Sequence, residues 1–332
     1  MKRVTSADVA REVGVSRATV SYLLNNTPGQ TISEETRRRV LEAAERLGYT
    51  PNRNARALRL GRSDIVLLPL GDAALSHVFA HAINACSAAL NRQGFTLVAD
   101  ATMHPSPKEA TDAWLRLDPA AFIDLILPAE HEAVVRMMRA GIARVTADMD
   151  VPSHLSAMDL ISVEARMLQL SHVIDHGATN IVYAAPSSFY DSSKRALLGP
   201  ALDAIATNAG VELRYEAVNL TSESVRASAS RWALGGCDAI CGHSDDLALP
   251  ILTALVDLGV DVPTAMLVIG VDDIPASSVS TPTLSSVTWV VEQLGESLAA
   301  GVQSAVLDPS KPVEYAVPEL LVIERDSTNR QR

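Results

Sequence analysis

Several features that define particular protein classes are missing from this 332-residue sequence. Its three cysteines, Cys86, Cys237 and Cys241, are too few for a disulfide framework. No run reaches the roughly 18 apolar residues of a membrane-spanning helix. Residues 1–6 read Met-Lys-Arg-Val-Thr-Ser and lack the apolar segment of a secretory signal. We therefore expect a soluble cytoplasmic protein.

Motifs typical of enzymes are also missing. The chain has no Gly-x-Gly-x-x-Gly pattern and no phosphate-loop lysine. Residues 243–245 read His-Ser-Asp, but contiguous side chains do not easily form the face-to-face arrangement of a catalytic triad. The acidic pairs at 245–246 and 272–273 suit helix capping and ligand hydrogen bonding better than acid–base catalysis. We predict no catalytic residues, no enzymatic activity and no cofactor.

Two histidine pairs have the spacing that places both imidazoles on one helix face. They are His77 with His81 and His172 with His176. A zinc site needs three or four ligands, and no cysteine or glutamate completes either pair in the sequence. We therefore predict no metal site.

Charge is unevenly distributed along the chain, whose formal net charge is −11. Residues 1–62 hold 12 Lys or Arg and 6 Asp or Glu, a net charge of +6, whereas the remaining residues hold 16 and 33, a net charge of −17. A basic segment attracts phosphates and an acidic body repels them. This distribution confines any contact with nucleic acid to the beginning of the chain.

The first 25 residues predict a helix, a tight turn and a second helix. Thr5 and Asp8 have the spacing of a capping box, and Gly14 permits the positive φ of a sharp turn. Ser16 caps the second helix, which extends from residue 17 to about residue 24. The predicted buried positions are Val9, Ala10, Val13, Val20, Leu23 and Leu24. The outward-facing side chains are expected to read a major groove and the adjacent phosphates; they are Ser16, Arg17, Ala18, Thr19, Ser21, Tyr22 and Asn25.

A third helix and an arginine-rich linker follow. The helix is predicted to begin after Ser33 and to end at Gly48, with Val40, Leu41, Ala44 and Leu47 as its core stripe. Residues 51–62 are too few for a stable helix without a partner. Ala55 and Leu58 lie on one face, where the same segment of a second subunit can pair with them. An exposed leucine between arginines can also act as a wedge in a minor groove. A protein-binding three-helix module and a solvated basic linker remain alternatives.

These motifs resemble the lactose-repressor (LacI/GalR) family of bacterial regulators. The matching segments are residues 4–25, residues 33–49 and residues 51–58. The resemblance implies a homodimer on a pseudo-palindromic operator, with the linker as a hinge helix that bends DNA. It adds the contact residues Thr5, Tyr49, Asn52, Ala55, Leu58 and Arg59. Tyr22 stands where many members carry arginine, so the half-site is expected to differ, because tyrosine cannot make the bidentate contact to guanine.

Apolar, β-rich runs alternate with helical patterns through the rest of the chain. Strands are predicted at 64–70, 95–99, 123–127, 143–147, 180–184, 238–241 and 266–271. Helices are predicted at 78–93, 108–117, 131–140, 163–176, 194–209, 222–234, 246–258 and 291–306. This alternation predicts an α/β core with parallel sheets covered on both faces.

The resulting domain plan has a helix-turn-helix domain at 1–50, a hinge at 51–62 and a core at 63–332. The core resembles the periplasmic-binding-protein-like body of the same family. Its two predicted lobes comprise 63–158 with 288–310, and 159–287 with 311–332. Open α/β sheets bind ligands at the carboxyl ends of their strands, which places an effector cleft between the lobes.

The predicted effector site departs from the family pattern. By resemblance, Asp272 bonds effector hydroxyls. Ala196 replaces the usual arginine, Ser244 the usual asparagine and Trp289 a common glutamine, and the neighbouring Lys194 and Arg195 are expected to point elsewhere. Added aromatic faces favour a more apolar or ring-shaped effector, or a pocket that has lost its ligand. The predicted site residues are His77, Asp148, Tyr190, Ser192, Ser244, Asp272 and Trp289.

The sequence thus predicts a dimeric DNA-binding regulator, a repressor controlled by a small sugar-like effector and associated with the nucleoid when bound. Closure of the lobes on the effector is expected to change the spacing of the paired hinges and so the DNA affinity. Alternatives are a cytoplasmic binding protein of the sugar-receptor type and a regulator that has lost effector sensing. The sequence ends without a leucine-heptad tail, which favours a dimer over a tetramer.

Overall fold

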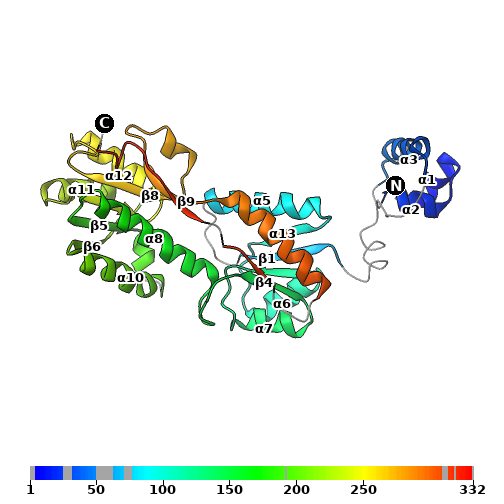
Figure 1. The fold of residues 1–332 in the computed structure, drawn as a ribbon. Helices are drawn as coiled ribbons and strands as arrows, with labels where there is room; N and C mark the ends of the chain where they lie inside the picture. Colours follow the sequence, from blue (N-terminus) through cyan, green and yellow to red (C-terminus); the bar gives the residue numbers. More distant parts are fainter. Residues whose placement is uncertain are drawn as a thin grey trace. The chain divides into compact units, whose positions relative to one another are not determined.

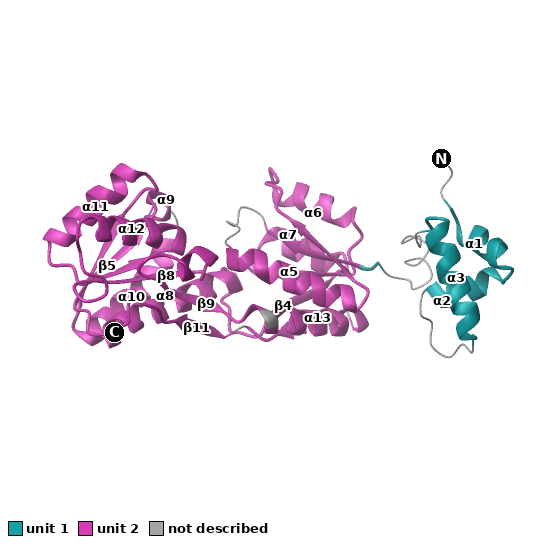
Figure 2. Ribbon diagram, turned by 90° about the horizontal axis from the view of Figure 1, so that it is seen from above, with its two compact units in different colours: residues 1–64 teal, residues 65–332 magenta. Residues whose placement is uncertain are grey.

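The computed structural model describes residues 4–24, 32–49, 63–70, 77–190, 193–308, 313–317 and 319–330. The chain divides into two compact units, Met1–Asp64 and Ile65–Arg332 (Figure 2). The predicted hinge at 51–62 lies outside the described residues. Within the described part of the chain, no helix combines the length and the apolar character needed to cross a membrane.

The described residues of the first unit form the helices α1 (Ser6–Val13), α2 (Arg17–Leu24) and α3 (Glu34–Arg46). The Asp8 carboxylate accepts hydrogen bonds from the N–H and the hydroxyl of Thr5, at 2.9 and 2.7 Å. Gly14 ends α1 with φ 76°, which a glycine adopts without strain. The Ser16 hydroxyl then accepts from the N–H of Thr19 at 3.0 Å and caps α2. The predicted helix, turn and helix are therefore confirmed.

The core of the first unit confirms most of the predicted stripe, with one error. Val40, Ala43 and Ala44 of α3 are buried against α1 and α2. Leu41, which was expected to join them, is 48% exposed. A helix turns by about 100° per residue, so a position beside Val40 faces away from the stripe at 40, 43, 44 and 47.

The second unit has two lobes, each built on one sheet (Figure 1). The first sheet has the strand order β10-β4-β3-β1-β2, and all its strands run parallel. Its strands are β1 (Ile65–Pro69), β2 (Thr96–Asp100), β3 (Ala121–Asp124), β4 (Ala143–Ala147) and β10 (Val313–Tyr315). Its helices are α5 (His77–Arg92), α6 (Pro107–Leu115), α7 (Glu132–Arg139) and α13 (Val291–Leu307).

Alternating side chains of β1 explain why helices cover both faces of this sheet. Val66 and Leu68 are buried with α5 and α13, which lie side by side in Figure 1. Leu67 points to the other face and packs with Trp114 of α6 and Met137 of α7. A parallel sheet covered on both faces was predicted from the apolar runs, and it is confirmed.

The second sheet has the order β11-β9-β8-β7-β5-β6 and is parallel except for β11, which runs antiparallel to β9. Its strands are β5 (Asn180–Ala185), β6 (Glu212–Ala217), β7 (Ala239–Gly242), β8 (Leu267–Val271), β9 (Ser285–Trp289) and β11 (Leu320–Ile323). Its helices are α8 (Ala157–Asp175), α9 (Ser187–Tyr190), α10 (Ser193–Ala209), α11 (Ser222–Leu234) and α12 (Asp245–Asp257). A short 3₁₀ helix, η1 (Pro275–Ser278), follows β8.

Within the described elements of the second unit, the chain passes between the lobes in three places. The start of α8 packs in the first lobe through Ala157 and Ile161, and its later residues pack in the second lobe. The second passage lies between β9 and α13, and the third between β10 and β11. Assigning 311–332 to the second lobe was therefore wrong at its start, because β10 pairs with β4.

Candidate DNA-binding surface and effector cleft

The exposed face of α2 carries most of the predicted major-groove residues. Ser16, Arg17 and Ala18 are exposed, Thr19 and Ser21 are half-buried, and Tyr22 is 37% exposed. Val20 and Leu23 occupy the opposite face in the core. The helix therefore presents polar groups and one aromatic ring to solvent, as a major-groove reader requires.

Arg17 differs from the arginines of α3. Arg37 and Arg38 of α3 pair with Glu34 and Glu42, at 3.4 and 3.1 Å. Arg17 donates instead to the Ser6 hydroxyl at 3.1 Å and has no carboxylate within ion-pair distance among the described residues. Its charge is therefore available to a phosphate or a base edge.

The remaining residues predicted to contact DNA differ in their hydrogen bonds and burial. The hydroxyl proton of Thr5 is engaged by Asp8, and the two hydrogen bonds from Thr5, with help from Arg11, lower the pKa of Asp8 to about 2. Tyr49 packs against the core of the first unit. The other members of the predicted set lie outside the described residues: Asn25, Asn52, Ala55, Leu58 and Arg59.

A cavity of about 460 Å³ lies between the two lobes. It opens where the strands of the second sheet end, because His243 follows β7, Asp272 follows β8 and Trp289 ends β9. Phe79 and Ile126 line it from the first lobe. The other lining residues are Ser156, Met158, Asp159, Ser162, Val163, Arg166, Phe189, Lys194, Leu197, Leu198, Ser244 and Asp246. This is the position predicted for an effector.

The predicted effector residues divide into two groups. Ser244, Asp272 and Trp289 line the cavity. Tyr190 does not, because its hydroxyl donates to the carbonyl oxygens of Tyr183 and Glu216, at 3.2 and 2.9 Å, inside the second lobe. The exposed residues His77 and Asp148 are also absent from the lining, and Ser192 lies outside the described residues.

Arg166 is a cavity residue that the sequence reasoning missed. Its two terminal nitrogens donate to the carbonyl oxygens of Ser162 and His243, at 3.2 and 3.1 Å. Its Nε is buried and has no hydrogen-bond partner. A buried donor without an acceptor costs about 1–3 kcal/mol, so this N–H favours a ligand that brings an acceptor into the cavity.

His243 beside Arg166 is held in its neutral form. Burial, together with the nearby charges of Arg166 and Lys194, lowers the pKa of His243 to about 3. Its Nδ1 lies 2.8 Å from the Tyr183 hydroxyl. The ring of Phe189 packs against His243 at 4.9 Å between ring centroids. The side chains of His243 and Phe189 are therefore aromatic, uncharged parts of the cavity wall.

The expectation for Lys194 was wrong, whereas Arg195 points away from the cavity as expected. Lys194 lines the cavity. The guanidinium of Arg195 lies over the ring of Tyr215, 3.8 Å from its centroid. The cavity therefore contains two cations, Lys194 and Arg166, although it lacks the arginine usual in the family.

A buried carboxylate supports the turn that carries Asp272. Asp245 accepts hydrogen bonds from the hydroxyls of Ser277 and Ser286, at 2.6 and 2.7 Å, and from the N–H of Ile274 at 3.0 Å. Burial raises its pKa to about 7. Asp272 itself has φ 103°, a conformation that a non-glycine residue adopts only where its surroundings impose it. The Asp245 contacts and the turn together hold Asp272 at the cavity wall.

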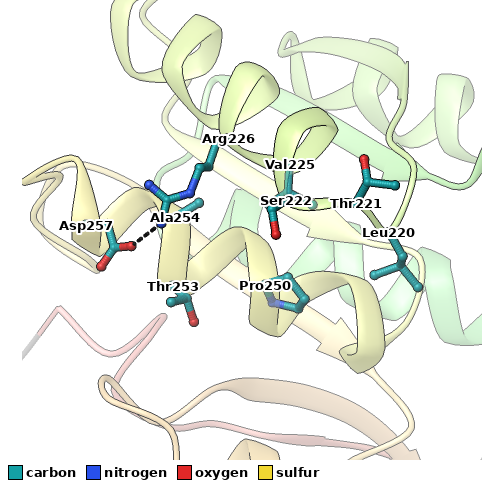
Figure 3. A pocket seen from close by; sticks show the side chains of 9 residues that line it. All are labelled: Leu220, Thr221, Ser222, Val225, Arg226, Pro250, Thr253, Ala254 and Asp257. Atoms are coloured by element: carbon teal, nitrogen blue, oxygen red, sulfur yellow. Dashed lines mark hydrogen bonds and ion pairs between the residues drawn. The ribbon is translucent and has the colours of Figure 1, made fainter.

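A second hollow, of about 320 Å³, lies between α11 and α12 (Figure 3). Its two charged lining residues, Arg226 and Asp257, pair with each other at 3.1 Å. The rest of its lining is mostly short or apolar, including Leu220, Val225 and Pro250. A ligand would gain little from charges that already neutralise each other, so the inter-lobe cavity is the stronger candidate.

A helix-turn-helix unit and a two-lobed unit with a ligand-sized cavity define a class of protein, the ligand-responsive DNA-binding regulators. Residues 5–52 match the model of the bacterial regulatory proteins of the lacI family, and residues 170–328 match a periplasmic binding protein-like domain.

Known proteins similar over nearly the whole chain support the same class. The HTH-type transcriptional regulator reg1 of Streptomyces lividans is 30% identical, over 95% of this chain and 94% of its own. The regulator GalS of Salmonella typhimurium is 27% identical, over 88% of this chain and 87% of its own. A lac repressor dimer solved with operator and an anti-inducer superposes with a TM-score of 0.73 at 20% identity, over 98% and 99% of the two chains.

A complex of the regulator CelR with cellobiose has a TM-score of 0.62 at 22% identity, over 98% of this chain and all of that one. The chain belongs to the lacI family of bacterial regulatory proteins, and it is a DNA-binding transcriptional regulator.

Proposed function

We propose that the protein is a homodimeric repressor that binds a pseudo-palindromic operator and responds to a hydroxylated small molecule in the inter-lobe cavity. The first unit reads the major groove with the exposed face of α2. The segment around Asn52, Ala55, Leu58 and Arg59 bends the minor groove, as the sequence predicts. The protein acts in the cytoplasm, at the nucleoid when bound to DNA, and carries no enzymatic activity.

The observation that carries this proposal is the lining of the 460 Å³ cavity. Ligand pockets occupy about 300–1,000 Å³ and combine apolar walls with a few polar groups. Here Phe79, Phe189 and Trp289 supply aromatic faces, while Arg166 and Asp272 supply a donor and an acceptor. A sugar-like ring offers both apolar faces and hydroxyls. The relative solved with cellobiose supports this class of ligand.

In-vitro selection of genomic DNA by the purified protein tests the regulatory function. We expect enrichment of a palindrome with a flexible central step, because two hinge leucines inserted there kink the duplex. Leu58→Ala is expected to weaken binding to that palindrome and not to abolish folding. Folded protein that enriches no sequence, with or without candidate effectors, would contradict the proposal.

Replacement of Arg166 by lysine tests the cavity. Calorimetry against neutral and acidic mono- and disaccharides first identifies a binding sugar. Arg166→Lys is then expected to weaken its binding about 10–100-fold, because a hydrogen bond to a charged group contributes about 1.5–3 kcal/mol. The matched control is Arg214→Lys, since the buried Nε of Arg214 also lacks a hydrogen-bond partner, with a carboxylate oxygen of Glu212 3.6 Å away, and this residue does not line the cavity. Equal losses in both variants would show that Arg166 does not contact the ligand.

A further inference from the structure

The second histidine pair meets a carboxylate that comes from a distant part of the sequence. His172 and His176 lie at the end of α8, with ring centroids 4.2 Å apart. Glu324 directly follows β11. One ring nitrogen of each histidine and one carboxylate oxygen of Glu324 lie within 4.8 Å of one another. The sequence reasoning rejected a metal site because it searched for the third ligand near the histidines, and the fold supplies it from the C-terminal segment.

Hydrogen bonds orient both rings. Nε2 of His172 lies 2.9 Å from the Thr328 hydroxyl, and Nδ1 of His176 lies 2.7 Å from the carbonyl oxygen of His172. The opposite nitrogen of His176, Nε2, faces Glu324 at 3.5 Å, and we assign the metal to this atom and to Nδ1 of His172, the nitrogen not bonded to Thr328. Metal-binding histidines characteristically use their second nitrogen in this way, which fixes the tautomer and the ring plane.

One pair in the cluster already has the spacing that a small divalent ion requires, and the whole set lies within 4.8 Å. Two ligands of a tetrahedral zinc ion, at about 2.0–2.1 Å from the metal, lie about 3.4 Å apart. Nε2 of His176 and the nearer oxygen of Glu324 are 3.5 Å apart. His172 is 9% exposed, whereas the side chains of His176 and Glu324 are 26% and 41% exposed. Solvent can therefore deliver an ion to one side of the cluster while the buried ring anchors the other.

We propose that His172, His176 and Glu324 bind one divalent transition-metal ion of the zinc class. Two histidines and one glutamate form a known three-ligand set for zinc, with water in the fourth position. The ion joins the last turn of α8 to the segment after β11. That segment is already held to the sheet through Ser327, whose hydroxyl donates to the carbonyl oxygen of Val268 at 2.6 Å. Metal binding would therefore attach the C-terminal segment to α8 in addition to the sheet.

Cobalt(II) titrated into metal-free, full-length protein tests the proposal, because its visible absorption reports a coordination site of low symmetry. We expect one equivalent per chain, displaced by zinc. Glu324→Gln is expected to lower the affinity at least about 10-fold, as does loss of a nearby supporting contact in known sites. His81→Gln, which breaks the other histidine pair, is the matched control and should leave the affinity unchanged.

Thermal unfolding with and without zinc separates metal binding from folding. The melting temperature should rise with zinc in the unmodified protein and in His81→Gln, because a ligand that binds only the folded state stabilises it. It should not rise in Glu324→Gln, whose metal-free melting temperature should match that of the unmodified protein. Unmodified protein that binds no cobalt overturns the proposal. Undiminished cobalt affinity in Glu324→Gln would also overturn it. The same holds for a loss of cobalt binding in His81→Gln.

Discussion

Replacing Asp245 with alanine is expected to destabilise the protein by about 2–5 kcal/mol. Three donors, the hydroxyls of Ser277 and Ser286 and the N–H of Ile274, would lose their acceptor in a buried site. Each orphaned group costs about 1–3 kcal/mol, and removing the cost of burying the carboxyl group itself offsets part of that loss. Urea unfolding followed by tryptophan fluorescence measures the change, since Trp232 is buried in the adjacent hydrophobic cluster.

The matched control is Asp246→Ala, in the same first turn of α12. It removes a carboxyl group from the same helix N-terminus, where acidic groups contribute about 0.3–1 kcal/mol, but it leaves the buried hydrogen bonds intact. Gly270 leaves the space that the Asp245 carboxylate occupies, because a Cβ at position 270 would lie 1.9 Å from one of its oxygens. A loss in Asp245→Ala no larger than in Asp246→Ala would show that the hydroxyl contacts contribute little.

The same residue makes stability depend on pH. Burial raises the pKa of Asp245 from its ordinary value of 3.8 to about 7 in the folded state. The stability linked to its protonation is therefore fully present below about pH 4 and is lost as the pH rises through about 7. Asp245→Asn, which keeps the shape of a protonated carboxyl group, should flatten the dependence of unfolding free energy between about pH 4 and about pH 7. An unchanged slope would mean that the carboxylate stays ionised.

Arg17→Ala is expected to reduce operator affinity about 10–100-fold, because a base or phosphate contact by arginine contributes about 1–3 kcal/mol. Arg17 lies exposed on the reading face of α2, and the carboxylates of the described residues do not engage it. Fluorescence anisotropy with labelled operator DNA at several salt concentrations measures the change. If the contact is to a phosphate, the slope of log affinity against log salt should fall by about 1.

Arg38→Ala supplies the control for this measurement. Arg38 is exposed on α3 and pairs with Glu42 at 3.1 Å. The variant removes one positive charge from the same unit, so any general electrostatic effect is the same in both variants. If Arg17→Ala and Arg38→Ala weaken binding equally, Arg17 contributes only through net charge.

The parts of the fold that sequence could predict are those whose patterns are local. Apolar runs such as Leu267–Val271 identify buried parallel strands. The edge strand β6 was not predicted, because the charged residues Glu212, Arg214 and Glu216 alternate with apolar ones and leave no apolar run. The strand β9 was missed for another reason. Its serines, Ser285 and Ser286, are buried through hydrogen bonds to partners far along the chain.

The residues of the cavity also divide into those that the sequence could predict and those that it could not. Ser244, Asp272 and Trp289 were predictable because the resemblance to the family places effector contacts at these positions, and all three line the cavity. Arg166 was not, because it belongs to a helix whose cavity-facing side is defined only when the lobes meet. Tyr190 was a reasonable candidate by position, but two carbonyl oxygens satisfy its hydroxyl within the lobe.

The antiparallel pairing of β9 and β11 sets how the two lobes can move. Trp289 lies opposite Leu320, and the N–H of Val290 donates to the carbonyl oxygen of Glu319 at 3.1 Å, so two of the three passages form one ribbon. A two-stranded ribbon bends across its flat face and resists bending within its plane. Trp289 belongs to this ribbon and also lines the cavity. A ligand in contact with its ring therefore acts directly on the connection between the lobes. A ligand that displaces the ring of Trp289 should therefore also change the angle between the lobes.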